Sequence, residues 1–180
     1  MNARGARAKG RNFDNEIARI LSHWYFGVPD ALIRTHGSRS RKGFVDQVGD
    51  LGIARANLPK PWVFAVENKS RDRRPSPNKN APAWTVEELL FNSDAALLQY
   101  WKQCRTAGIE GKKIPLLVCK KKYQKPLIGI RKRDYDSLSL VIRPKLILND
   151  SVVFASLELF LKQTTADDWI DVWRLHYGGS

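Results

Sequence analysis

The chain has 180 residues, 43% of them hydrophobic, and its 31 Lys and Arg against 18 Asp and Glu give a net charge of +13. This length and apolar content suit one folded domain with a sizeable core and exclude a disordered chain, while the positive charge favours a polyanionic partner such as nucleic acid. No apolar run approaches the ~20 residues that span a bilayer, and no hydrophobic segment follows the basic N-terminus, so we expect neither a membrane partner nor secretion but a cytoplasmic, nucleoid or host-cytoplasmic protein.

The first part of the chain predicts one helix followed by strands. Apolar side chains recur at helical spacing over residues 9–26, and Gly27 ahead of Pro29 is a typical helix stop. Three segments with strand character follow, at residues 31–35, 44–54 and 62–70. Small, polar and basic residues predict exposed loops at 39–43 and 70–82.

The second part predicts a further helix and more strands. Residues 84–107 have helical periodicity, with an interruption that suggests two pieces, and strands are expected at 114–119 and 126–130. An edge strand is expected within 138–148 and a helix around 153–161, while the residues from Thr164 onward allow no prediction. The order of elements predicts an α/β (α+β) fold, with a mixed central β-sheet flanked by helices.

The most informative chemistry lies at the end of the segment 62–70, where an apolar run leads into Glu67, Asn68 and Lys69. In a strand, Glu67 and Lys69 project from the same side, and a buried pair of charges is costly unless it serves a ligand. Asp50 precedes another apolar segment and could supply a second carboxylate. Mg²⁺ or Mn²⁺ prefers such oxygen ligands, the backbone carbonyl of Asn68 could add another, and Lys69 could hold an attacking water.

Five short motifs in order resemble the PD-(D/E)xK nuclease superfamily, and most closely its Holliday-junction resolvase branch. They are Lys9-Gly10, Phe13-Asp14, Gly37-Ser38, Asp50-Leu51-Gly52-Ile53-Ala54 and Glu67-Asn68-Lys69-Ser70. The resemblance covers residues 9–70, and the order of the following helix and two strands gives weaker support up to residue 131. It implies a restriction-endonuclease-like core over 9–131 within a single domain of residues 1–180, with a basic flexible arm at 1–8 and a C-terminal extension at 132–180.

The resemblance also implies an activity and a set of catalytic residues. It implies a divalent-metal-dependent DNA endonuclease, selective for branched DNA, that acts as a homodimer in recombination or repair. Asp50 and Glu67 would hold the metal, Lys69 would act on the water, and an acid on the first helix would complete the shell. That acid is either Asp14 or Glu16, since both lie beside the apolar stripe of the helix.

Other choices stay open at this point. Asp46 is an alternative to Asp50 as the metal ligand, and Asn68 departs from the aliphatic residue that the family usually has there. Basic and polar residues near the motifs are expected to contact DNA: Lys9, Arg11, Ser38, Arg39, Arg41, Lys42, Arg71, Arg73 and Arg74. The alternatives for the function are another PD-(D/E)xK nuclease (restriction-like, repair or nicking) and a non-catalytic nucleic-acid-binding protein on the same fold.

Overall fold

The computed structural model describes residues 3–35, 48–55, 57–71, 96–121, 124–138, 146–148 and 151–178. Within these ranges, the side chains of residues 3–7, 9, 71, 96 and 146–148 are not described. No helix in this part of the chain is long and apolar enough to cross a membrane.

A five-stranded mixed β-sheet forms the centre of the molecule, with strand order β3-β4-β5-β7-β6. The strands are β3 (Phe64–Arg71), β4 (Ile114–Lys121), β5 (Leu127–Arg131), β6 (Leu146–Leu148) and β7 (Val152–Ser156). The pair β3–β4 is parallel and the other pairs are antiparallel. Helix α3 (Ala96–Glu110) lies between β3 and β4 in sequence, as a parallel crossover requires. The predicted mixed sheet flanked by helices is therefore confirmed.

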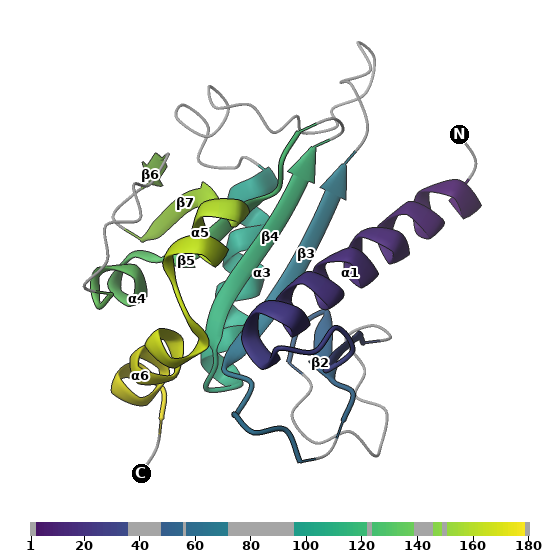
Figure 1. The fold of residues 1–180 in the computed structure, drawn as a ribbon. Helices are drawn as coiled ribbons and strands as arrows, with labels where there is room; N and C mark the ends of the chain where they lie inside the picture. Colours follow the sequence, from purple (N-terminus) through teal and green to yellow (C-terminus); the bar gives the residue numbers. More distant parts are fainter. Residues whose placement is uncertain are drawn as a thin grey trace.

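Helices cover both faces of this sheet (Figure 1). On one face, α1 (Ala3–Phe26), α5 (Leu157–Gln163) and α6 (Ala166–His176) share a large aromatic and aliphatic core with the sheet. On the other face, α3 packs through Leu97, Leu98, Trp101 and Cys104. The alternation of strand side chains separates the two cores, because Leu116 and Val118 belong to the first core whereas Leu117 lies in the second.

Two short strands lie beside the free side of β3. Strands β1 (Leu32–Arg34) and β2 (Leu51–Ile53) form an antiparallel pair. An isolated parallel bridge between Gly49 and Val66 joins this hairpin to β3. The residue after that bridge is Asp50, so the small sheet determines where its carboxylate lies.

Several elements differ from the sequence-based expectations. Helix α1 begins at Ala3, inside the segment expected to be a flexible arm, because its Ala, Arg and Lys residues favour a helix without forming an apolar stripe. Residues 152–156, expected to begin a helix, form β7, and the helix begins only at Leu157. Strand β7 pairs with β5, so part of the segment expected to be an extension completes the sheet. The edge strand expected within 138–148 is present as β6.

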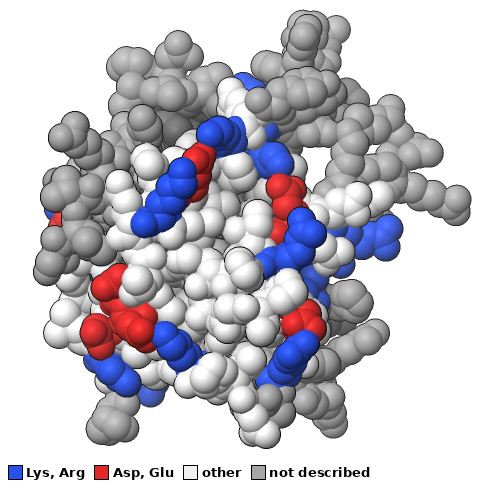
Figure 2. All heavy atoms as spheres, in the orientation of Figure 1, with Lys and Arg blue, Asp and Glu red and all other residues white. Residues whose placement is uncertain are grey.

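Charges of both signs lie side by side on the face seen in Figure 2, often as ion pairs. Glu158, for example, accepts from Lys125 at 2.7 Å and from Lys162 at 2.8 Å. Acidic side chains gather over α6, whose first two turns contain Asp167, Asp168 and Asp171. This acidic end lies away from the carboxyl end of β3 (Figure 1).

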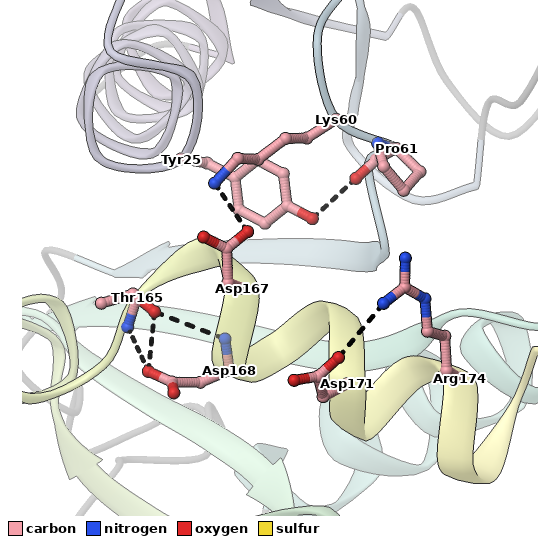
Figure 3. Close-up of polar contacts among 8 residues, drawn as sticks. All are labelled: Tyr25, Lys60, Pro61, Thr165, Asp167, Asp168, Asp171 and Arg174. Atoms are coloured by element: carbon pink, nitrogen blue, oxygen red, sulfur yellow. Dashed lines mark hydrogen bonds and ion pairs between the residues drawn. The ribbon is translucent and has the colours of Figure 1, made fainter.

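Polar contacts fix α6 to the rest of the domain (Figure 3). Thr165 and Asp168 form a capping box, in which the Thr165 amide donates to the Asp168 carboxylate at 2.7 Å. Lys60, in the segment before β3, donates to Asp167 at 2.7 Å. Trp169 of the same helix is buried and packs against Phe64 of β3, with 5.5 Å between the ring centroids.

Candidate active site

The proposed catalytic residues lie around β3, the edge strand of the main sheet. Phe64 and Val66 pack in the core on the α1 side, and Asn68 continues this alternation. Glu67 and Lys69 project to the α3 side, where the Lys69 Nζ donates to the Glu67 carboxylate and lies 5.2 Å from the centre of the Tyr100 ring. The predicted placement of Glu67 and Lys69 on one side of a strand is therefore confirmed.

Among the described residues, β3 has no full strand partner on the side opposite β4, and Asp50 lies along that side. Its backbone N–H donates to the Val66 carbonyl at 2.6 Å, and its Oδ2 accepts from the backbone N–H of Asn68 at 2.8 Å. Thr35 fixes the other side, since its N–H donates to the Asp50 carbonyl at 2.8 Å and its hydroxyl to the Gly49 carbonyl at 2.7 Å. One carboxylate oxygen of Asp50 is thus engaged with the backbone.

Helix α1 presents Asp14 and Glu16 in different surroundings. Asp14 accepts from Arg34 Nε of β1 at 2.7 Å, and its side chain is only 13% exposed. Glu16 is 40% exposed and pairs with Lys120 of β4, with 3.2 Å between Nζ and Oε1. Of these two acids, Asp14 is the one that interacts electrostatically with both Asp50 and Glu67.

Burial and neighbouring charges raise the pKa values of Glu67 and Asp14. Burial raises the pKa of Glu67 most, and the charges of Asp50 and Asp14 raise it further against the opposing effect of Lys69. Burial and the Asp50 charge also raise the pKa of Asp14, although Arg34 opposes them. Burial lowers the pKa of Lys69, but the charges of Glu67 and Asp50 outweigh it, so this pKa is raised. The carboxylates of this cluster therefore repel one another, and a bound cation would reduce that repulsion.

The donor chemistry of this cluster fits a divalent metal ion. Within the described ranges, no three Asp, Glu, His or Cys side chains are arranged to hold a metal ion directly. Mg²⁺, however, is usually bound by one or two carboxylates and keeps several waters. Asp50 and Glu67 could supply two carboxylates, and Asp14 could act through a water. Because these oxygens repel one another, a divalent cation suits the position between them.

The structure describes only some of the residues that the sequence predicts to contact DNA. Arg11 is exposed on α1, while Lys9 in α1 and Arg71 in β3 are placed by their backbone only. The remaining ones lie outside the described residues: Ser38, Arg39, Arg41, Lys42, Asp46, Arg73 and Arg74. The expected DNA contacts of this group stay predictions.

Three side chains near the site were not singled out by the sequence. Arg34 pairs with Asp14, Lys120 with Glu16, and Tyr100 packs against Lys69. The signal for the first two was a basic residue at the end of an apolar strand. No comparable signal existed for Tyr100, whose aromatic ring resembles the core residues that surround it in the sequence.

Comparison with known proteins identifies the family. Residues 5–165 match the family described as "Phage putative PDDEXK endonuclease". No curated protein sequence matches the chain. Among solved structures, Archaeoglobus fulgidus Hjc, a Holliday junction resolvase from an archaeal hyperthermophile, is 16% identical, with 88% of this chain and 98% of that chain covered and a TM-score of 0.32. That likeness is too remote to support an argument, but the family model spans most of the sequence, and the chain therefore belongs to this family of PDDEXK endonucleases.

Proposed function

We propose that the protein is a divalent-metal-dependent DNA endonuclease that selects branched DNA, in the manner of a Holliday-junction resolvase. The main support is the cluster around the edge of β3, where burial and the Asp50 charge raise the pKa values of Asp14 and Glu67 beside Lys69. A family of endonucleases supplies the reaction class, and the net charge of +13 suits a nucleic-acid substrate.

In this proposal Asp50 and Glu67 hold Mg²⁺ or Mn²⁺, and the Asn68 carbonyl and Asp14 complete its surroundings. The chemistry that such an ion supplies is neutralisation of phosphate charge and formation of hydroxide near neutral pH. The backbone bond from Asn68 to Asp50 Oδ2 orients the Asp50 carboxylate before any ligand arrives. Glu16 is assigned no metal role, because it is 40% exposed, whereas Asp14 is 13% exposed and interacts electrostatically with Asp50 and Glu67.

Lys69 acts as a cation in this proposal. Its pKa is raised in the ligand-free protein, so the ammonium group is protonated at neutral pH and is a hydrogen-bond donor. A donor at this place can orient an attacking water and stabilise the additional negative charge on a phosphate at the transition state. Glu67 and the Tyr100 ring hold its Nζ from two sides.

The selectivity and the oligomeric state are parts of the same proposal. A symmetric pair of cuts across a junction requires two active sites, so we propose a homodimer that acts in recombination or repair. Basic residues near the sequence motifs would bind DNA phosphates and make DNA binding salt-dependent. They are Lys9, Arg11, Arg39, Arg41, Lys42, Arg71, Arg73 and Arg74, and Ser38 would add a polar contact.

The test compares four-way junction, duplex and single-stranded DNA in Mg²⁺, Mn²⁺ or EDTA. We expect cleavage of the junction only with metal, and losses of at least about 10²-fold in Asp50→Asn and Lys69→Ala. Asp171→Asn on α6, 75% exposed, and Lys162→Ala on α5, 68% exposed, are the matched controls and should retain activity.

The outcomes separate the alternatives. Cleavage in EDTA, or full activity of Lys69→Ala, would contradict the mechanism. Cleavage of all duplexes alike would retain the nuclease and reject junction selectivity. Binding without cleavage in either metal would support a binding protein, and a monomer in analytical ultracentrifugation with bound junction would reject the dimer.

A further inference from the structure

The side chain of Asn68 is buried without a hydrogen-bond partner. It is 7% exposed, and among the described residues neither its Oδ1 nor its Nδ2 has a partner. Its neighbours on this face of the sheet, Phe64, Val66 and the cross-strand Val118, are apolar and fully buried. A hydrophobic residue would therefore fit the same place, and the amide has a cost that the fold alone does not explain.

The amide lies close to the site, near Asp14 of α1. It interacts with the Asp14 carboxyl and lowers its pKa, although the two groups do not reach hydrogen-bond geometry. A carboxylate only accepts hydrogen bonds, so Nδ2 is the amide atom that faces Asp14. Oδ1 is then free to accept from a donor that protein groups in the described ranges do not provide.

We propose that Asn68 is a positioning residue for the metal site, with Oδ1 accepting from a water in the hydration shell of the divalent ion and Nδ2 donating toward Asp14. The inference rests on the proposed function and deepens it. Mg²⁺ dehydrates reluctantly, so a site with few direct carboxylate ligands needs acceptors for the waters that remain. The outer partners of a metal typically change its affinity 10- to 100-fold.

This role predicts opposite effects on stability and on metal binding. Asn68→Leu has nearly the same shape and removes both unpaired atoms, so the metal-free variant should unfold at a higher urea concentration than the wild type. The same variant should bind Ca²⁺ or Mg²⁺ about 10- to 100-fold more weakly in calorimetric titration. For junction DNA, kcat should fall while KM stays unchanged.

Val118→Ala is the matched control, since Val118 of β4 is the cross-strand partner of Asn68 and lies on the same face of the sheet. It should unfold at a lower urea concentration and retain the metal affinity of the wild type. Equal metal affinity of Asn68→Leu and wild type, or a lower urea midpoint of Asn68→Leu, would overturn the inference. If such a result is obtained while the wild type binds metal and cleaves DNA, only the role of Asn68 is rejected. If the wild type binds no divalent ion, the proposed function is rejected as well.

Discussion

Gly49 is the residue on which the position of Asp50 depends most directly. Its φ of +90° lies in the region that L side chains rarely adopt. A Cβ added there would lie 2.9 Å from the Val66 nitrogen and 3.0 Å from its carbonyl carbon, and closer still to the carbonyl oxygen. All of these are backbone atoms of β3, so no side chain can move aside to accept a methyl group.

The cost of Gly49→Ala can be worked from these contacts. A non-glycine residue at positive φ costs about 1–2 kcal/mol. Relief of the overlap requires residues 49–50 to move off β3, which breaks the Asp50 N–H bond to Val66 and the Asn68 N–H bond to Asp50 Oδ2. Each lost bond costs about 1 kcal/mol, so the free energy of unfolding should fall by about 3–4 kcal/mol.

The activity should fall as well, because Asp50 moves with the backbone. A displacement of about 1 Å at a catalytic group costs about 10²-fold in rate. The measurements are urea denaturation and the initial rate of metal-dependent junction cleavage at saturating metal.

Gly27→Ala is the control that isolates the backbone strain. Gly27 also has a positive φ, of +75°, but nothing lies within 4 Å of the Cβ position. This variant should lose only about 1–2 kcal/mol and keep its activity. If Gly49→Ala is no less stable than Gly27→Ala and cleaves at the wild-type rate, the argument that close approach to β3 positions Asp50 is refuted.

Three further predictions concern other residues. Asp14→Asn should reduce the cleavage rate at least about 10²-fold and Glu16→Gln only a few-fold; equal losses in junction cleavage would contradict the choice of Asp14. Tyr100→Leu should lower kcat up to about tenfold through loss of the ring over Lys69, while Tyr100→Phe keeps the rate; a full rate in the Leu variant would exclude the contact from catalysis. Burial raises the pKa of Asp134, so the folded protein holds this proton more tightly than the unfolded chain does. As the pH rises from about 4 through the raised pKa, the free energy of unfolding of the wild type should therefore fall relative to that of Asp134→Asn. A difference in urea midpoint between the two proteins that stays constant over this pH range would contradict the prediction.

Local pattern was enough to predict the elements that are periodic and strongly apolar. The stripe Phe13, Ile17 and Leu21 lies in the core as the helical spacing predicts, and the alternation of β3 places Glu67 and Lys69 together. The order of elements was enough for the mixed sheet, because a helix between β3 and β4 permits their parallel pairing.

Other features depend on contacts that are distant in sequence. The composition of residues 152–156 permits a helix or a strand, and pairing with β5 makes them the strand β7. The ion pair of Arg34 with Asp14 joins two elements whose relative position no local pattern contains. The choice of Asp14 over Glu16 that we propose could not be made from helical geometry, since it depends on Asp50 and Glu67, which lie on other segments of the chain.

The site has three carboxylates around one strand edge because the edge is reached from both faces. Glu67 projects to the α3 side, Asp14 approaches from the α1 side, and Asp50 hydrogen-bonds to the edge itself. A strand paired on both sides would separate Glu67 and Asp14 by a continuous sheet. A strand at a sheet edge is usually a liability for aggregation, and within the described residues Gly49 and Asp50 lie along this edge of β3. The same two residues thus protect the edge and bring a charge to it, which explains why a glycine without space for a methyl group precedes the central acid.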